Sequence, residues 1–213
     1  MTRFVALLIS AVVLGYAPAG FAQSQNFDDR IVEEEAQQPL KPQPAAKPQA
    51  TVEFPPELDG LFDKLKRTRD PKLAERISTR IWEKWQTSDS KSVDLLTYWA
   101  RAASSQRKYS KALDLLDQVI VLRPDYAEGY NQRATLHYLM ENYGKSIRDI
   151  ERTLALEPRH YGALAGLAAI LEKLNRKQQA LETWYRALEV YPAMQTAQKS
   201  VVRLEEELAG KGI

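Results

Sequence analysis

The sequence contains no cysteine among its 213 residues. This absence excludes disulfides, a lipid-modified N-terminal cysteine, thiol catalysis and every metal site built on thiolates. Only two histidines are present, His137 and His160, and their separation of 23 residues gives no zinc-binding helix motif. A serine elbow of the G-x-S-x-G kind is also missing. We therefore expect no catalytic residues, no metal and no cofactor, and we interpret the chain as non-enzymatic.

An excess of one charge sign is also absent, because the formal net charge is +2 at pH 7. Nothing in this balance requires a nucleic acid or an acidic membrane surface as a partner. The apolar content of 44% is enough for a sizeable core. Without disulfides, that core has to be stabilised by packing alone.

The longest apolar run lies at the N-terminus. Residues 1–22 have one basic side chain, Arg3, then an apolar run from Phe4 to Val13 and small residues up to Ala22, which together predict a secretory signal peptide. We expect cleavage between Ala22 and Gln23, with a second candidate site after residue 19, and hence a bacterial periplasmic protein without an integral membrane span. The alternative is an uncleaved N-terminus that anchors the chain in the inner membrane.

Residues 23–56 hold six of the eleven prolines and are rich in Gln, Ala and charged residues. Such a composition buries too little apolar surface to offset the entropy of ordering. We predict a disordered tether that acts as a spacer. A docking strand for envelope proteins or peptidoglycan is the alternative.

Three prolines, Pro124, Pro158 and Pro192, follow one another at intervals of 34 residues. Each interrupts a helical pattern, so each is expected to end one helix and begin a turn. Counting back from them defines three units without gaps, 93–126, 127–160 and 161–194. Every unit has small residues at its positions 8 and 20, where two helices would approach closely: Ala100, Ala134 and Ala168, and Ala112, Ser146 and Ala180. Because one helix pair cannot bury its apolar faces alone, the units should stack into a solenoid.

These residues resemble the tetratricopeptide repeat (TPR) family. The resemblance covers 102 residues and includes the large residue at position 4, the small residues at 8 and 20, the aromatic residue at 17 (Tyr109 and Tyr143) and the proline at 32. Arg133 at position 7 and Lys177 at position 17 depart from the pattern. The resemblance implies an all-α, right-handed solenoid of helical hairpins, about nine helices in total.

The flanks fit the same pattern less well. Residues 57–92 have apolar residues on one helical face and are interpreted as a degenerate N-terminal capping repeat. Residues 195–213 place one apolar stripe on a charged helix, which predicts a C-terminal capping helix and tail ended by Gly210.

Three polar residues of the repeats need an explanation. Arg133 lies on a buried face, so it needs a partner, and Asp149 on the second helix of its unit is the candidate; a guanidinium that faces a ligand is the alternative. His137 is expected to be packed and neutral. His160 is expected to be a surface turn residue, or to form an anion-binding corner with Arg159.

In the TPR family the first helices of the repeats line a concave groove. Transferred by position, the resemblance implies a partner-binding surface made of Thr97, Arg101, Ser104, Asn131, Thr135, Tyr138, Gly162, Ala165, Gly166, Ala169, Glu172, Lys199 and Arg203. Four of these are small and cluster in the third unit. They would let either the backbone of a bound segment or a neighbouring helix of the same chain approach closely. The lysine and asparagine that clamp acidic tails in chaperone-binding members are replaced by Thr97 and Arg101, so that ligand class is not transferred.

We therefore expect a periplasmic scaffold that binds a protein segment in its groove and supports cell-envelope assembly or integrity. A saccharide-binding or peptidoglycan-associated accessory factor is the alternative, and an accessory subunit of an envelope enzyme is a third reading. The envelope role rests on the expected periplasmic localisation and on analogy.

Overall fold

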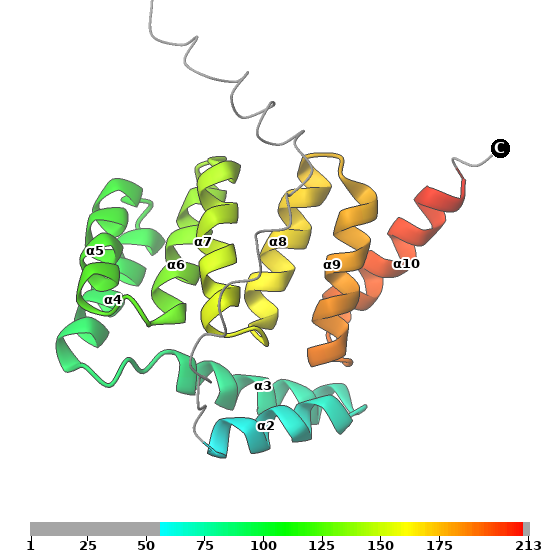
Figure 1. Cartoon of the computed structure of the whole chain (residues 1–213), viewed down its shortest axis with the longest axis horizontal. Helices are drawn as coiled ribbons and strands as arrows, with labels where there is room; N and C mark the ends of the chain where they lie inside the picture. Colours follow the sequence, from blue (N-terminus) through cyan, green and yellow to red (C-terminus); the bar gives the residue numbers. More distant parts are fainter. Residues whose placement is uncertain (1–55, 211–213) are drawn as a thin grey trace, which may run out of the picture. The chain divides into compact units, whose positions relative to one another are not determined.

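The computed structural model describes residues 56–210, so the predicted signal peptide, most of the tether and the last three residues lie outside the described part. This part consists of nine α-helices joined by short turns (Figure 1). Their bounds are α2 (Pro56–Arg67), α3 (Pro71–Trp85), α4 (Lys91–Ser105), α5 (Tyr109–Leu122), α6 (Ala127–Leu139), α7 (Tyr143–Leu156), α8 (Tyr161–Lys173), α9 (Lys177–Val190) and α10 (Gln195–Ala209). Each of the three 34-residue units contains one helix pair, and the all-α fold is as predicted.

The turns repeat with the period of the sequence. Each periodic proline is the second residue after the end of the second helix of its unit. Pro158 therefore lies in the turn after α7, as predicted. Within each unit the turn between the two helices uses a residue in the left-handed region, at Arg107 (φ 58°), Glu141 (φ 60°) and Asn175 (φ 56°). The left-handed conformation is uncommon outside glycine, so its return every 34 residues shows that the three units share one backbone geometry.

Small side chains let the two helices of each unit approach closely. The predicted small residues at position 20, Ala112, Ser146 and Ala180, have no exposed surface. In the second unit, the Ser146 hydroxyl donates a hydrogen bond of 2.7 Å to the carbonyl oxygen of Ala134, which is the small residue at position 8. This direct contact confirms that positions 8 and 20 face each other.

Successive units stack through a second helix and the first helix that follows it. α5 packs on α6, α7 on α8, and α9 on α10. The contact at the C-terminal end is a core of apolar residues from α8, α9 and α10, among them Leu171, Trp184 and Leu204. No helix between residues 56 and 210 is long and apolar enough to cross a membrane.

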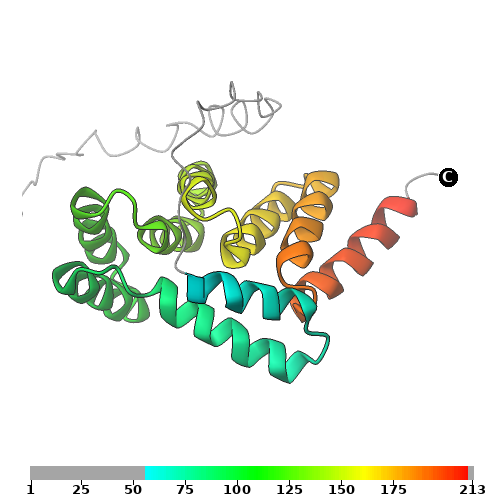
Figure 2. The same ribbon diagram turned by 60° about the horizontal axis from the view of Figure 1, so that its bottom comes forward.

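The hairpin of α2 and α3 does not continue this stacking. It runs crosswise to the helices of the repeats (Figures 1 and 2), and α2 contacts α9. Its core includes Leu65, Ile81 and Trp85 together with Tyr161, the first residue of α8, and Ala193 in the turn after α9. The predicted capping segment is therefore attached along the turns of the second and third units instead of lying end-on against α4.

His160 takes part in this attachment. The expectation that His160 is a surface turn residue is wrong. Its side chain has no exposed surface, because the ring of Trp85 stacks on it with centroids 4.0 Å apart. Its Nδ1 accepts a hydrogen bond from the backbone N–H of Ala163, which caps α8. The neighbouring Arg159 pairs with Glu157 and Asp59, so its charge is engaged by carboxylates of the chain itself.

The predicted pairing of Arg133 with Asp149 is confirmed. The guanidinium donates to both carboxylate oxygens, at 2.8 and 2.6 Å, and its third nitrogen reaches Asp117 on α5 at 2.7 Å. The hydrogen bonds with Asp149 raise the pKa of Arg133 above its ordinary value. Arg133 thus links its own unit to the preceding one.

His137 is buried, as predicted, and burial lowers its pKa. The Asp149 carboxylate, 4.0 Å from Nε2, acts in the opposite direction but is the smaller effect. The side chain is therefore neutral at pH 7.

Candidate functional site

Two adjoining hollows lie along the first helices of the repeats. The first has a volume of about 380 Å³ and lies between α4 and α6, with α3 at its edge. Arg101 and Ser104 of α4, and Asn131 and Thr135 of α6, line it. All four belong to the predicted groove, so the structure brings them together.

The second hollow has a volume of about 200 Å³ and continues from the first, because Asn131 and Thr135 line both. Its walls come from α6, α7 and α8 and are mostly apolar or small. The predicted residues in it are Asn131, Thr135, Tyr138, Gly162, Gly166 and Ala169. We call the two hollows together the groove.

The two glycines of α8 have different surroundings. A Cβ atom at Gly166 would meet only Ile150, at 3.6 Å, so this glycine leaves the hollow open. A Cβ atom at Gly162 would lie 3.0 Å from the ring of Trp82, so this glycine makes room for α3. Contact with a neighbouring helix therefore accounts for Gly162, whereas the space at Gly166 is not filled by the chain itself.

Five of the predicted groove residues line neither hollow. Thr97 has no exposed surface, and its hydroxyl donates to the carbonyl oxygen of Val93. Ala165 is half-buried against the core of α8, α9 and α10. The remaining three lie beyond the hollows, on α8 and α10: Glu172, Lys199 and Arg203.

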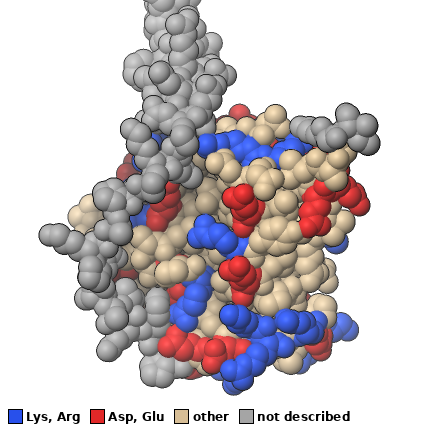
Figure 3. Space-filling view, turned by 45° about the vertical axis from the view of Figure 1, so that its right-hand side comes forward, with Lys and Arg blue, Asp and Glu red and all other residues tan. Residues whose placement is uncertain are grey.

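Arg203 and Glu172 neutralise each other. The guanidinium of Arg203 binds the carboxylate of Glu172 and also Glu207 at 3.0 Å, and these contacts raise its pKa. Figure 3, with the α9–α10 end turned forward, shows acidic and basic side chains beside one another on this surface. The charge of Arg203, one of the two basic groove residues expected on α10, is therefore compensated by acids.

The groove residues that were not predicted include Trp82, Gln86, Glu128 and Gln132. Trp82 and Gln86 come from the α2–α3 hairpin, which the repeat pattern places outside the groove. Arg101 donates a 2.8 Å hydrogen bond to Gln86 and so connects α4 to the end of α3. Two tryptophans three residues apart, Trp82 and Trp85, are a signal that this helix needs a large apolar contact elsewhere.

A buried carboxylate organises the polar wall of the first hollow. Glu128 is 4% exposed and accepts hydrogen bonds from the amides of Asn131 (2.9 Å) and Gln132 (3.0 Å). Its other neighbour is His160 Nε2, at 3.2 Å. Because His160 Nδ1 accepts from Ala163, Nε2 carries the proton and donates to Glu128. These contacts fix the amide planes of Asn131 and Gln132 at the groove wall.

One acceptor of this wall has no partner. Within the described part of the chain, Oε1 of Gln132 is buried and accepts no hydrogen bond. A buried acceptor without a partner is costly to the folded state. Among residues 56–210, no group of His, Cys, Asp and Glu side chains could hold a metal ion.

No family model matches the chain. A TPR repeat-containing protein of Rhizobium etli is 50% identical over 153 residues, which are 72% of this chain and 75% of that protein. Anaphase-promoting complex subunit 3 of Schizosaccharomyces pombe is 32% identical over 93 residues, but these are only 14% of its length.

Solved structures have the same fold at lower identity. The first TPR domain of Spaghetti (RPAP3), bound to an HSP90 peptide, matches with a TM-score of 0.54 and 20% identity, over 56% of this chain and 95% of that one. MamA matches with a TM-score of 0.52 and 18% identity, over 70% of this chain and 84% of that one. The stacked helix pairs and the groove on their first helices define a helical-repeat binding protein. With the Rhizobium relative, they show that the chain belongs to the tetratricopeptide repeat family.

Proposed function

We propose that the protein is a non-enzymatic scaffold that binds an extended segment of another protein in its groove. The observation that carries this proposal is the continuity of the two hollows through Asn131 and Thr135, with Gly166 leaving the second hollow open. Volumes of a few hundred Å³ suit single side chains or a short stretch of backbone. The TPR domain of Spaghetti (RPAP3) bound to an HSP90 peptide, and the TPR2B domain of yeast Sti1 in complex with pHsp70, support a protein ligand.

The chemistry of the groove fits a peptide backbone. The hydroxyls of Ser104 and Thr135 offer polar contacts for backbone groups at the first hollow. The second hollow, with Ala134, Ile150 and Ile170 in its walls, suits an apolar side chain. The ligand is thus an extended segment with an apolar residue next to accessible backbone amides.

Capture of partners by two variants tests this proposal. Gly166→Leu fills the second hollow, so it is expected to keep its fold and to lose at least about tenfold in capture of groove partners. Val121→Ser is the control, since Val121 lies on α5, is 80% exposed and lines neither hollow. Equal capture by wild type and Gly166→Leu, with both folded, would contradict groove binding.

We also propose that this scaffold works in the bacterial periplasm and supports envelope assembly or integrity. The apolar run and the small-residue end of residues 1–22 support export. N-terminal sequencing of the protein purified from cells is expected to give Gln23. An intact Met1 in the membrane fraction would instead support the anchored alternative.

A saccharide ligand is the second candidate. Trp82, Gln86, Asn131 and Gln132 give the first hollow one aromatic ring and three side-chain amides, a combination suited to hydroxyl groups and to the apolar face of a sugar. Titration of soluble peptidoglycan fragments into wild type and Trp82→Ala distinguishes the two candidates. Saturable binding that Trp82→Ala removes would favour the saccharide.

A further inference from the structure

The turn end of the α2–α3 hairpin is strongly basic, and we call residues 64–76 the tip. The tip has six basic and two acidic side chains, although the formal net charge of the whole chain is only +2. The six basic residues are all exposed: Lys64, Lys66, Arg67, Arg69, Lys72 and Arg76. Figure 3 shows Lys and Arg side chains clustered at the lower edge of the surface, where Figure 1 places the hairpin. The near-neutral balance of the whole sequence therefore hides a local excess of positive charge.

Two helix flanks meet at the tip. Each flank follows one side of its helix at intervals of three, four or seven residues: Glu57, Lys64 and Arg67 on α2, and Leu73, Arg76, Arg80 and Lys84 on α3. The carboxylate of Glu57 connects the two flanks, because it lies 3.8 Å from Arg80 and 2.8 Å from Lys84. Since the two helices form a hairpin, the opposite ends of the same flanks meet as well. The cations of α2 therefore lie beside Leu73 and Arg76.

The cations at the two ends of these flanks are balanced differently. At the far end, Glu57 pairs with two cations of α3. Among residues 56–210, the cations of the tip form one ion pair with a carboxylate, from Arg67 to Asp63 at 3.7 Å, and these side chains are 82% and 71% exposed. An ion pair so exposed is weakened by water and salt and contributes little. The tip thus keeps a net positive charge that an external anion can neutralise.

The tip is an ordered turn. The Thr68 hydroxyl donates a 2.7 Å hydrogen bond to the carbonyl oxygen of Lys64 near the end of α2. The Asp70 carboxylate accepts a 2.9 Å hydrogen bond from the backbone N–H of Lys72 and thereby caps α3. These bonds fix the ends of both helices, so little conformational entropy is lost when the tip binds a partner.

An exposed leucine lies among the cations. Leu73 is 47% exposed, whereas Ala74 and Ile77 of the same helix are buried in the hairpin core. The second acid of the tip, Glu75, lies about 200° around the helix from Leu73 and therefore on another side of α3. A leucine among lysines and arginines suits a membrane surface, where the apolar side chain enters the boundary between headgroups and acyl chains and the cations stay at the phosphates. A soluble anion would neutralise the cations but leave the leucine in water.

We propose that the tip binds the surface of an anionic phospholipid bilayer. Leu73 enters the headgroup region, and the cations of both flanks contact the lipid phosphates. Near such a surface each lysine or arginine strengthens binding by about fivefold. The attachment is peripheral, is separate from the groove and does not depend on the proposed function.

Vesicle flotation with the full protein tests this proposal. The protein purified from cells is mixed with vesicles of phosphatidylcholine alone or of an equimolar mixture of phosphatidylcholine and phosphatidylglycerol. We expect at least about tenfold tighter binding to the anionic vesicles, and weaker binding as the salt concentration rises. The tip variant Lys64→Gln/Arg67→Gln/Arg76→Gln is expected to lose at least about tenfold in affinity for the anionic vesicles.

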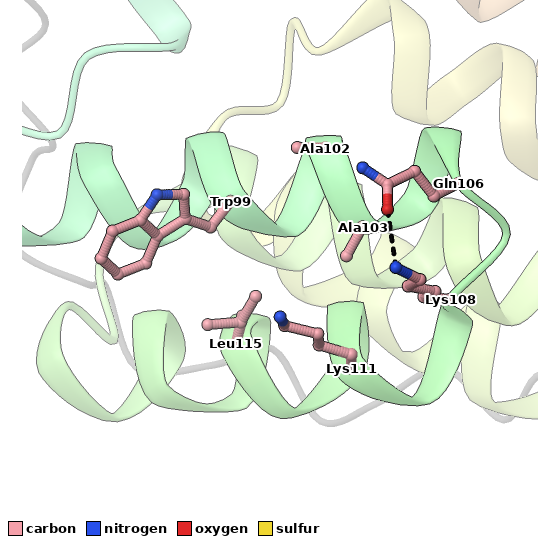
Figure 4. A pocket seen from close by; sticks show the side chains of 7 residues that line it. All are labelled: Trp99, Ala102, Ala103, Gln106, Lys108, Lys111 and Leu115. Carbon is pink, nitrogen blue, oxygen red and sulfur yellow. Dashed lines mark hydrogen bonds between the residues drawn. The ribbon is translucent and has the colours of Figure 1, made fainter.

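A matched variant controls for net charge. Lys91→Gln/Lys108→Gln/Lys111→Gln removes the same charge from exposed lysines of the first repeat, two of which line a hollow between α4 and α5 (Figure 4). Its binding should stay within about twofold of the wild type, because screening limits the attraction to charges close to the bilayer. Equal losses in the two triple variants, or equal binding to neutral and anionic vesicles, would overturn the proposal.

The absence of cysteine allows a direct readout of contact that does not depend on the tip variant. Leu73→Cys is labelled with an environment-sensitive fluorophore, and its emission should shift to shorter wavelength when anionic vesicles are added. Val202→Cys is the control, because Val202 is 55% exposed on α10. The same shift at both positions, or no shift at residue 73, would contradict insertion of the tip and overturn the proposal.

Inorganic phosphate distinguishes a bilayer from a soluble anion. Phosphate and sodium chloride at equal ionic strength should release the protein from anionic vesicles equally, and Leu73→Ser should weaken vesicle binding at least about threefold. Stronger release by phosphate, together with unchanged binding of Leu73→Ser, would identify a site for a free anion and overturn the proposal.

Discussion

At the scale of single residues, Arg133 is a largely buried cation at a position that departs from the repeat pattern, and it has to be paired. Its side chain is 24% exposed, that of Asp149 is 8% exposed and that of Asp117 is 59% exposed. Asp149 therefore carries the buried half of the interaction. We predict that Asp149→Ala lowers the free energy of unfolding by about 1–3 kcal/mol, less than for a fully buried pair because Asp117 remains.

The matched control is Asp117→Ala, which removes an exposed carboxylate and should cost less than about 1 kcal/mol. The double variant Arg133→Leu/Asp149→Ala removes both charges and should recover most of the stability lost in Asp149→Ala. Urea unfolding followed by circular dichroism measures all three. Equal effects of Asp149→Ala and Asp117→Ala would contradict the assignment of the buried partner.

The burial of His137 predicts that the stability of the fold decreases as the pH falls. Burial lowers its folded-state pKa below the ordinary 6.5, so the unfolded chain takes up this proton first as the pH falls. The stability contributed by the neutral ring is complete well above pH 6.5 and is lost as the pH falls through 6.5 toward the folded pKa. For one proton, the free energy of unfolding cannot change by more than about 1.4 kcal/mol per pH unit.

The comparison that isolates this effect is His137→Phe, which keeps an aromatic ring and removes the titration. Melting temperatures of wild type and variant between pH 7.5 and 5.5 are expected to diverge, with the wild type losing more. Parallel pH profiles would show that His137 does not titrate differently in the folded and unfolded states.

At the scale of elements, α8 contains a matched pair of glycines. Glycine in a helix costs about 0.5–1 kcal/mol relative to alanine, so Gly166→Ala, which meets only Ile150 at 3.6 Å, should stabilise the fold by about that amount. Gly162→Ala gains the same propensity but places Cβ 3.0 Å from the Trp82 ring, which other aromatic rings hold in place. We predict that Gly162→Ala is the less stable of the two by about 1 kcal/mol.

Thermal melts of the two variants, with Trp82→Ala/Gly162→Ala added, check this assignment. Removal of the indole should abolish the penalty at residue 162. Identical stabilities of the two single variants would mean that α3 is not packed against α8 in solution.

The elements that the sequence could predict are those governed by the 34-residue period. Because equivalent residues face equivalent neighbours, the small residues at positions 8 and 20 and the proline at position 32 are sufficient to locate α4 to α9. The pairing of Arg133 with Asp149 was predictable for the same reason, as both lie within one unit. Eight of the thirteen predicted groove residues line the two hollows for the same reason.

The path of α2 and α3 could not be predicted in this way. It depends on contacts between distant segments, such as Trp85 on His160 and Arg159 with Asp59, which no periodic pattern contains. The wrong expectation for His160 has the same cause, because a turn residue is buried here by a helix from another part of the chain. Trp82 and Gln86 were absent from the predicted groove for that reason too.

At the scale of the whole molecule, the crosswise hairpin of α2 and α3 affects two surfaces of the repeats. It adds one wall to the groove through Trp82 and Gln86, and it leaves Leu95 and Trp99 of α4 exposed at the first repeat. The end of the last repeat is covered by α10, whose Arg203 and Glu207 form ion pairs with α8 and α9. Substitutions in the groove and at Leu95 are therefore expected to have independent effects.

The central claim is that a protein segment binds in the groove, and photo-crosslinking at Thr135 tests it most directly. Thr135 is exposed and lines both hollows, so a photoreactive amino acid placed there should crosslink to the bound segment in cells. The same amino acid at Val121, 80% exposed on α5, is the control. The account predicts a discrete protein adduct from residue 135 that Gly166→Leu reduces at least about tenfold and that residue 121 does not give. The same adduct from residue 121, or no loss with Gly166→Leu, would contradict it.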